Sequence, residues 1–453
     1  MADGPRSWRS GARRIAMGAA LLALLGAGCA DESNDNGGGG GGKESGPIKV
    51  GVLTTCGGPF AVFEAQSLSG AKYALIHNAG GKAQGTGPQD SVSGAKVAGR
   101  PIQIEFGCSD ATPDKATAEA RRLVENENVD ILLGPLSGDE GVAVANYATS
   151  LPGVTFVNGT SGAQETTLRV KAPNFFRFGG DGAQWMAGTG TYAYNELGWR
   201  KAAILGEDYS YPYTLAAGFT GEFCALGGQI TKRLWAPLDT TDWSSYVNQL
   251  PKDVDGVLFL TGGANTVSAM KAYLNFGGKI KGKAMGGSSV LDPTAFAIGP
   301  KLAGLVGGSP VPLGGKTPEW TDYVDGFGQV YPKVAAESLF TVLYYDGMDA
   351  ILQGLEKTGG DLGGNEEAFR KALEGLKPQF PNGRVKLDDN RNSIQPAYVI
   401  QVVNNGGELG FEVKNEITDV DETFGGLFGA DSPPPSRDEP ACEKGEPPPW
   451  ATG

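Results

Sequence analysis

Ile48-Lys-Val-Gly-Val-Leu53 is a short apolar run, and the glycine-rich turn Gly57-Gly58-Pro59 follows it. A nearly continuous apolar run of this length is typical of a strand that is buried on both faces of a parallel sheet. The pattern then changes to helical spacing over residues 64–78, and a second apolar strand is predicted at 102–106. Strand, helix and strand in this order begin a βαβ unit.

The same alternation continues toward the C-terminus. Thr112 is placed to cap a helix that has Pro113 at its first position, which is a favoured arrangement. Strands at 129–134 and 154–158 and a helix at 140–150 complete the series, whereas the polar, glycine-rich residues 80–99 are expected to form a surface insertion. This series predicts an open parallel sheet with helices on both faces.

A second series of the same kind follows residue 179. Helices are expected at 185–197, 213–226, 244–250 and 266–276, and strands at 201–205, 230–234, 256–260 and 284–286. Large helices (319–331, 336–356 and 366–376) and a closing strand pair (383–387 and 397–403) end the folded part. The predicted fold class is therefore α/β, with two Rossmann-like lobes.

The N-terminus has the three parts of a secretory signal. Four arginines within residues 6–14 precede an apolar run, Ile15–Gly28, that is too short to span a membrane. The next residue, Cys29, resembles the lipid-accepting cysteine of a bacterial lipobox. We expect a signal peptide over residues 1–28 and a lipid on Cys29; the alternative is ordinary cleavage that discards this cysteine or leaves it as a free thiol. Residues 29–47 are glycine-rich and are expected to be a flexible tether.

Composition argues against several classes of function. The net charge of −13 disfavours nucleic acid as a partner. His77 is the single histidine of the chain, so no multi-histidine metal site is possible, and its place near a helix C-terminus suits a favourable charge better than a catalyst. No nucleophile–base pair stands out. We therefore expect no enzyme activity, no metal and no cofactor.

Five cysteines become an even four once Cys29 carries lipid. Cys56 and Cys108 follow neighbouring strands of the first sheet and are predicted to form a disulfide. By elimination, Cys224 pairs with Cys442. The latter lies in residues 429–453, whose proline-rich composition predicts a disordered tail.

Ligands of open α/β sheets bind beyond the carboxyl ends of the strands. The corresponding loops contain Thr54–Phe60, Gly134–Glu140 and Asn158–Gly162 in the first lobe, and Gly206–Tyr213, Thr261–Gly263 and Gly286–Ser289 in the second. Their hydroxyls and helix N-termini suit a carboxylate. Taken alone, Ser137 is equally explained as a helix cap, and Tyr211 as a side chain packed on its own lobe.

These segments together resemble a known family. Ile48–Pro59, the helix at 110–124 with the Gly134-Pro-Leu-Ser137 loop, Asp208-Tyr-Ser-Tyr-Pro212 and Gly383–Asp388 resemble the type 1 periplasmic solute-binding proteins. The closest branch is the leucine/isoleucine/valine-binding proteins of ABC importers, and the resemblance extends from Ile48 to about Phe411.

The resemblance implies that three chain crossings form a hinge between the lobes. They are expected near 177–180, 304–310 and 382–384. Lobe 1 would then comprise 48–178 and 307–382, and lobe 2 would comprise 179–306 and 383–428. It also implies an extracytoplasmic, lipid-anchored monomer that captures an amino-acid-like, carboxylate or amide solute and delivers it to permease subunits in the membrane. The alternative is a sensor that passes the ligand signal to a receptor.

The resemblance also implies a set of ligand-binding residues. The carboxylate-binding positions of the family fall on Ser137, Gly138, Thr160 and Ser161, and aromatic positions fall on Phe63 and Tyr211. The strand-end loops add Phe60, Gly262 and Ser288. Where the family has an acidic partner for the ligand's ammonium group, this chain has Ser288 or a close neighbour, so recognition of an α-amino acid is in question; Asp139 and Asp208 are the possible substitutes. One half of the family's disulfide falls on Cys108 and the other on Ser137, which leaves Cys56 as the nearby partner.

Overall fold

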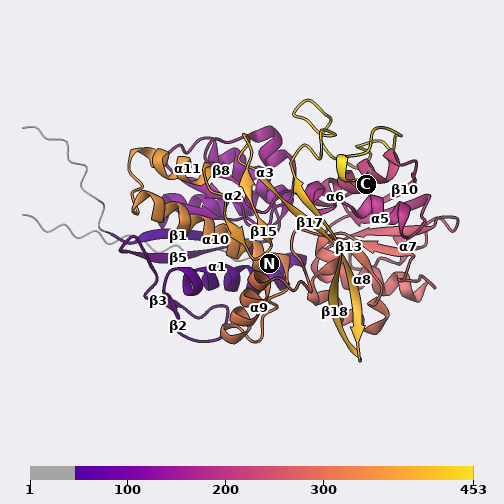
Figure 1. Ribbon diagram of the computed structural model, residues 1–453, viewed down its shortest axis with the longest axis horizontal. Helices are drawn as coiled ribbons and strands as arrows, with labels where there is room; N and C mark the ends of the chain where they lie inside the picture. Colours follow the sequence, from indigo (N-terminus) through magenta and orange to yellow (C-terminus); the bar gives the residue numbers. More distant parts are fainter. Residues whose placement is uncertain (1–45, 452–453) are drawn as a thin grey trace, which may run out of the picture. The chain divides into compact units, whose positions relative to one another are not determined.

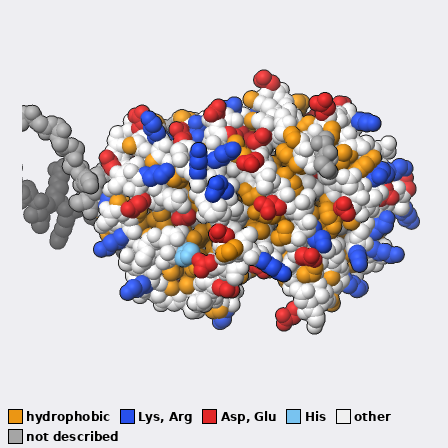
Figure 2. All heavy atoms as spheres, in the orientation of Figure 1, with side chains coloured by type: hydrophobic (Ala, Val, Ile, Leu, Met, Phe, Trp, Pro, Cys, Tyr) orange, Lys and Arg blue, Asp and Glu red, His pale blue; other side chains and the backbone are white. Residues whose placement is uncertain are grey.

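The computed structural model describes residues 46–451 (Figure 1). The predicted signal peptide, Cys29 and tether residues 29–45 lie outside the described residues. Within this range no helix is both long enough and apolar enough to cross a membrane. On the face shown in Figure 2, acidic and basic side chains are interspersed and do not separate into broad areas of one sign.

The first sheet has six strands, and all its pairs are parallel except the edge pair β4–β5. Its order is β4 (Lys96–Val97), β5 (Arg100–Ser109), β1 (Ile48–Thr55), β6 (Ile131–Leu133), β7 (Thr155–Val157) and β8 (Phe175–Phe176). Its helices are α1 (Glu64–Asn78), α2 (Pro113–Arg121) and α3 (Gly138–Ala148). The predicted cap of α2 is confirmed, because the Thr112 hydroxyl accepts a hydrogen bond from the Lys115 N–H at 3.4 Å. Insertion residues 80–99 contain the small β2–β3 pair (Lys82–Ala83 and Val92–Ser93).

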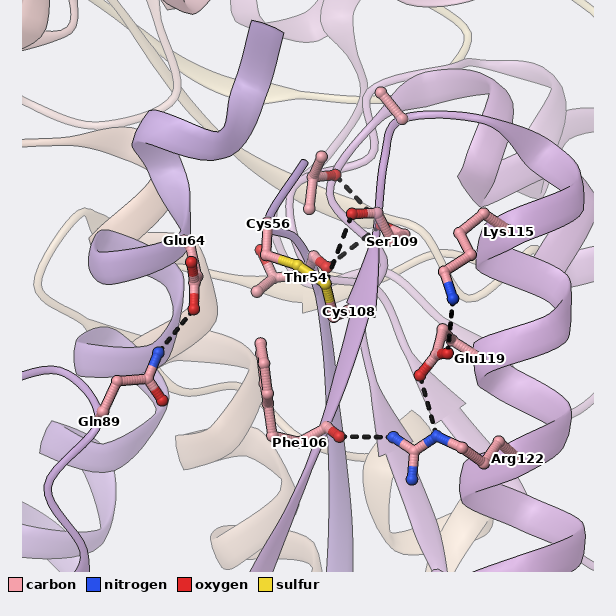
Figure 3. Close-up of a disulfide and its surroundings, with 12 residues drawn as sticks. Thr54, Cys56, Glu64, Gln89, Phe106, Cys108, Ser109, Lys115, Glu119 and Arg122 are labelled. Atoms are coloured by element: carbon pink, nitrogen blue, oxygen red, sulfur yellow. Dashed lines mark hydrogen bonds and ion pairs between the residues drawn. A yellow bond between two sulfur atoms is a disulfide. The ribbon is translucent and has the colours of Figure 1, made fainter. Parts of the chain in front are cut away.

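A disulfide joins the carboxyl ends of two neighbouring strands of this sheet, β1 and β5. Cys56 follows β1 directly and Cys108 lies near the end of β5, with their Cα atoms 5.5 Å apart. Figure 3 shows the bond beside Thr54 and Ser109, whose hydroxyl donates to the Thr54 carbonyl oxygen at 3.1 Å. The predicted Cys56–Cys108 pair is therefore confirmed, and it fixes the loop that leads to the 3-10 helix η1 (Gly58–Phe63).

The second sheet has eight strands. Its order is β10 (Gln229–Ala236), β9 (Lys201–Glu207), β11 (Gly256–Leu260), β12 (Ala284–Gly286), β13 (Val306–Ser309), β17 (Ser393–Asn405) and β16 (Lys386–Leu387), with β18 (Glu408–Val420) on β17. Its helices include α4 (Gly182–Trp185), α5 (Thr189–Asn195), α6 (Ser210–Ala225), α7 (Ser244–Val247) and α8 (Gly263–Asn275). The β17–β18 hairpin is longer than the predicted closing pair, and its turn is the Asn404–Gly407 sequence.

The chain passes between the two sheets three times. It enters the second sheet after β8 and returns after β13. The returning helices are α9 (Pro318–Val330), α10 (Leu339–Thr358) and α11 (Glu367–Glu374), of which α10 packs on α1 and α11 packs on α10. The small pair β14 (Gln379–Phe380) and β15 (Gly383–Arg384) precedes the last entry into the second sheet. The boundary predicted at residue 306 falls inside β13, which pairs with β12 at Val306 and Gly307 and with β17 as far as Ser309.

The helix predicted at 185–197 is divided in two. Gly188 has φ of +83°, a left-handed conformation that ends the helical path between α4 and α5. Its N–H donates to Glu222 Oε1 at 2.6 Å, so a buried carboxylate of α6 holds the break in place.

The prediction of a disordered tail is wrong for residues 429–451, which lie against the second lobe. Cys442 forms the predicted disulfide with Cys224 of α6, with Cα atoms 5.3 Å apart. The Trp450 indole N–H donates to Glu222 at 2.6 Å and its ring packs edge-on against Phe424. The proline-rich composition correctly indicates little regular structure, but it does not show that side chains and a disulfide anchor the segment.

Buried charges lie where the chain crosses between the lobes. Arg177, directly after β8, and Glu422, two residues after β18, are both 0% exposed, and their Nη2 and Oε1 atoms lie 3.7 Å apart. The Thr167 hydroxyl lies between them, accepting from Arg177 and donating to Glu422. Asp181 caps α4 through its contacts to the Ala183 and Gln184 N–H groups, and it is also fully buried. Elements from both lobes therefore meet around one guanidinium.

The free energy of unfolding is expected to fall between about pH 5 and about pH 8. Burial raises the pKa of Glu422 from 4.5 to about 7, more than the Arg177 charge lowers it. The folded protein thus holds this proton more tightly than the unfolded chain does. The resulting stabilisation is complete below the unfolded pKa of 4.5 and is lost as the pH rises through about 7.

Denaturant unfolding at several pH values measures this effect. The glutamine of Glu422→Gln cannot ionise. Between about pH 5 and pH 8 the free energy of unfolding of this variant should therefore fall by about 2 to 3 kcal/mol less than that of the unsubstituted protein. Glu416→Gln alters an exposed carboxylate of β18 and should follow the unsubstituted protein. Equal pH slopes for the unsubstituted protein and Glu422→Gln would contradict the prediction.

Candidate ligand-binding site

The loops at the carboxyl ends of both sheets line a small cavity, whose empty space is about 270 Å³ when the open space at its mouth is included. Lobe 1 contributes residues from η1, from the loops after β6 and β7, and from the start of α10. Lobe 2 contributes residues from α4, from the β9–α6 connection and the first turn of α6, and from the segment after β12. The lining residues are Phe60, Phe63, Leu136, Ser137, Thr160, Trp185, Tyr209, Tyr211, Ser289, Leu339 and Phe340. The cavity lies where the topology of open α/β sheets places ligands.

Aromatic rings from both lobes form most of the wall. In lobe 1, Phe63 stacks on Phe340 with ring centroids 3.7 Å apart. In lobe 2, Tyr211 meets Trp185 edge-on at 5.7 Å and lies 6.2 Å from Tyr209. The Phe60 and Tyr209 rings are 6.0 Å apart across the lobes. Such a wall favours a flat, apolar ligand body.

The polar groups of the cavity are hydroxyls. Ser137 precedes α3 and forms a capping box with Glu140: its buried hydroxyl faces the Glu140 N–H, and the Glu140 carboxylate accepts from the Ser137 N–H at 3.0 Å. The Tyr211 hydroxyl lies 2.9 Å from Ser289 Oγ, and either atom can donate. The Thr160 hydroxyl instead donates to the Leu136 carbonyl oxygen at 3.1 Å. A hydroxyl at a helix N-terminus is suited to a carboxylate, because the helix dipole is positive at that end.

Two predicted site glycines are points of close approach between the lobes. A Cβ on Gly138 of α3 would lie 2.6 Å from Ser210 Oγ and 2.9 Å from the Tyr211 N atom. A Cβ on Gly262 would lie 2.9 Å from the Phe60 ring. Near Gly138, the Ser210 N–H also donates to Asp139 Oδ1 at 3.1 Å across the lobes. The lobes are closed over the cavity in this structure, and only glycine permits the contact at these two positions.

None of the eleven lining residues is charged. The two carboxylates considered as ammonium partners are both engaged elsewhere: Asp139 accepts from the Ser210 N–H, and Asp208 binds Arg437 and the Tyr213 hydroxyl. Behind the wall, Asp292 of lobe 2 accepts hydrogen bonds from Ser338 at 2.6 Å and from Gln66 of lobe 1. The cavity therefore offers a carboxylate a better environment than it offers an ammonium group.

Burial also raises the pKa of two glutamates near the cavity, Glu207 and Glu140. Glu207, at the end of β9, is fully buried, and this burial raises its pKa to about 8 despite a 2.8 Å hydrogen bond from Asn265. Burial likewise raises the pKa of Glu140 in the first turn of α3. At neutral pH Glu207 is therefore largely protonated, which removes a negative charge beside residues 208–211, the segment that carries Tyr209 and Tyr211.

The structure brings together most of the residues that the sequence suggested. Phe60, Phe63, Ser137, Thr160 and Tyr211 line the cavity. The other four predicted residues lie beside it: Gly138 and Gly262 at the lobe contacts, Ser161 with its hydroxyl directed to the Gly138 carbonyl oxygen, and Ser288 buried one residue before the lining Ser289.

Six lining residues were not predicted: Leu136, Trp185, Tyr209, Ser289, Leu339 and Phe340. Leu136, Tyr209 and Ser289 lie in the predicted strand-end loops, one or two residues from a predicted site residue. The prediction of these loops is correct, but it does not identify these side chains. Trp185, Leu339 and Phe340 belong to helix segments distant in sequence. No local pattern distinguishes them from core residues, and only the tertiary structure places them at the cavity.

Two similar α/β lobes, three chain crossings and a closed cavity between strand ends define a two-lobed solute-binding protein. The family model described as periplasmic binding protein matches residues 47–408, and the chain belongs to this family. Its members are solute-binding proteins of ABC transporters, generally without enzyme activity, and the family implies a location outside the cytoplasm.

Known proteins agree with this assignment. The Leu/Ile/Val-binding protein homolog 6 of Brucella melitensis is 25% identical over 365 residues, covering 78% of this chain and 87% of the relative. An ABC transporter substrate-binding protein from Sphaerobacter thermophilus has a similar structure, with a TM-score of 0.72, 24% identity and coverage of 83% and 99% of the two chains. A Rhodopseudomonas palustris solute-binding protein, solved in complex with p-hydroxybenzoic acid, has a TM-score of 0.71 and 24% sequence identity to this chain. The match covers 83% of this chain and 98% of that protein. The resemblance to the leucine/isoleucine/valine-binding type is confirmed.

Proposed function

We propose that this chain is the lipid-anchored substrate-binding protein of an ABC importer and that it captures a small aromatic carboxylate between its lobes. The observation that carries the proposal is the composition of the cavity wall: eight of the eleven lining residues are aromatic or leucine, and the rest are uncharged hydroxyl residues. A benzoate-like ring would lie among the aromatic side chains, with its carboxylate toward Ser137 and the start of α3.

The absence of charge on the cavity wall supports an acid without an amino group. An α-ammonium group would be buried without a carboxylate partner on the cavity wall, and such burial is costly. The p-hydroxybenzoic acid complex of the R. palustris protein is an example of such a ligand on this fold.

A thermal-shift comparison tests the proposal. Matched compounds are leucine, isocaproate (leucine without its amino group), benzoate, p-hydroxybenzoate and benzamide. A ligand at 100 times its dissociation constant adds roughly 2.7 kcal/mol of stability. We expect shifts with the two aromatic acids and a weaker shift with isocaproate. Stabilisation by leucine alone would contradict the proposal.

The lipid anchor is tested separately. Cys29→Ser should abolish the association of the protein with the membrane.

Ser137→Ala should weaken the binding of benzoate about tenfold, because a hydrogen bond to a charged group is worth about 1.5 to 3 kcal/mol. Benzamide should lose less, since it carries no charge, and the difference between the two ligands isolates the carboxylate contact. Isothermal titration provides both constants. Ser268→Ala is the control, because its hydroxyl donates to the Ala264 carbonyl oxygen within α8. Equal losses for both ligands would show that Ser137 does not contact the carboxylate.

A further inference from the structure

The C-terminal strap, defined as residues 429–451, lies almost entirely outside regular secondary structure and beyond the part of the chain that the family model matches. In Figure 1 this segment, coloured yellow, lies over α6 and β10. Its position is fixed at several points: the Cys442 disulfide to α6, the Trp450 contact with Glu222, and the Pro440 carbonyl oxygen, which accepts from Arg233 of β10 at 2.6 Å.

One strap residue reaches the connection that builds the ligand cavity. The Arg437 guanidinium forms a two-point ion pair with Asp208, and its Nε lies 2.7 Å from Asp208 Oδ1. Asp208 immediately precedes Tyr209, and both Tyr209 and Tyr211 line the cavity. The Tyr213 hydroxyl donates to the same carboxylate. A bidentate arginine–carboxylate pair fixes orientation as well as distance.

The backbone of Arg437 is held as firmly as its side chain. Its carbonyl oxygen accepts from the Trp235 indole N–H at 2.9 Å, and Tyr213 packs edge-on against that indole at 4.9 Å. The Asp208 N–H donates to the Ala236 carbonyl oxygen at 2.9 Å. Arg437, Asp208 and Tyr213 thus form a cluster with the end of β10, which gives the guanidinium a defined direction.

The connection between β9 and α6 is held from two sides. Arg437 of the strap binds Asp208, and two residues later the Ser210 N–H donates to Asp139 of lobe 1. The strap itself also reaches lobe 1, because Arg169 donates to the carbonyl oxygens of Ala430 at 2.6 Å and of Ser432. The strap therefore contacts both lobes and the segment that carries the cavity tyrosines.

We propose that Arg437 is a positioning residue of the binding site: through Asp208, the C-terminal strap holds Tyr209 and Tyr211 in the arrangement that binds ligand. The strap is thus part of the binding apparatus of this chain, although it touches no ligand. The inference extends the proposed function, but its first test requires no ligand.

Hydrogen exchange of the full, ligand-free chain is that first test. Arg437→Gln should raise exchange of the residue 208–211 amides about tenfold and leave the melting temperature nearly unchanged, because the side chain is 64% exposed and the disulfide remains. Arg437→Lys keeps the charge but not the two-point geometry, so its exchange at residues 208–211 should lie between that of the unsubstituted protein and that of Arg437→Gln. Lys444→Gln removes an exposed charge from the same strap and is the matched control.

Affinity for p-hydroxybenzoate is the second readout. Arg437→Gln should weaken binding about tenfold, Arg437→Lys less, and Lys444→Gln not at all. If the exchange effect appears but no variant binds p-hydroxybenzoate, the proposed ligand is wrong and the positioning role stands. If exchange at 208–211 in Arg437→Gln equals that of Lys444→Gln, the positioning role is overturned.

Discussion

Gly138→Val is expected to lower ligand affinity at least about 100-fold, a loss of roughly 2.7 kcal/mol, while the protein remains folded. In the closed structure a Cβ on Gly138 would lie 2.6 Å from Ser210 Oγ and 2.9 Å from both the N and the Cβ atoms of Tyr211. Two of these three atoms belong to the backbone or its first side-chain carbon, so rotation of a side chain cannot relieve the overlap. The variant must separate the lobes.

The loss follows from how hinge proteins bind. A ligand drives closure only by its higher affinity for the closed form, and the substitution raises the free energy of that form alone. In an open form the added methyl groups would meet no atoms of the other lobe. Valine in a helix costs less than about 1 kcal/mol relative to alanine, so stability should change little.

Gly328→Val in α9 is the matched control, since nothing lies within 4 Å of a Cβ at that position. Titration with p-hydroxybenzoate measures both variants, and small-angle scattering reports whether ligand still contracts each one. The control should bind and contract as the unsubstituted protein does. Normal binding by Gly138→Val would show that the two lobes do not meet at this point when ligand is bound.

Arg177→Met is expected to lower the free energy of unfolding by about 3 to 5 kcal/mol. The guanidinium is 0% exposed, and its Nη1 donates to the Ala163 carbonyl oxygen at 2.7 Å. Methionine keeps much of the volume but leaves Glu422 and Asp181 buried without a cation. These acids belong to lobe 2, whereas Arg177 follows β8 of lobe 1, so the loss should affect unfolding of both lobes in one transition.

The control and a second variant separate charge from packing. Arg121→Met removes an ion pair whose arginine side chain is 55% exposed, and it should cost less than about 1 kcal/mol. Adding Glu422→Gln to Arg177→Met should restore part of the stability, because it removes one of the buried carboxyl groups that have lost their cation. Denaturant unfolding measures all three proteins. A cost below about 1 kcal/mol for Arg177→Met would contradict the role of this buried network.

Much of the fold was predictable because it depends on local patterns. The apolar run at Ile48 and the alternation that follows it indicate parallel strands and covering helices, and adjacent strands place Cys56 beside Cys108. Information that depends on tertiary contacts was not available from these patterns. The break at Gly188 depends on Glu222 of α6, and the order of the C-terminal strap depends on a disulfide and on Trp450.

The candidate site shows the same division. Strand-end loops contain Ser137, Thr160 and Tyr211, which the topology alone brings to one edge. Phe340 and Trp185 have ordinary helical spacing, so their sequence positions indicate core packing as readily as a cavity wall. Gly138 was chosen as a possible backbone contact for ligand, and the structure shows a second reason for glycine, namely the approach of Tyr211.

A calorimetric titration of the purified chain with p-hydroxybenzoate, repeated with leucine under the same conditions, tests the central claim most directly. The claim is that the closed, uncharged aromatic cavity binds a carboxylate that lacks an amino group. We predict one p-hydroxybenzoate site per chain, no detectable heat of binding for leucine, and loss of the site in Gly138→Val. Binding of leucine with no binding of p-hydroxybenzoate would contradict the account.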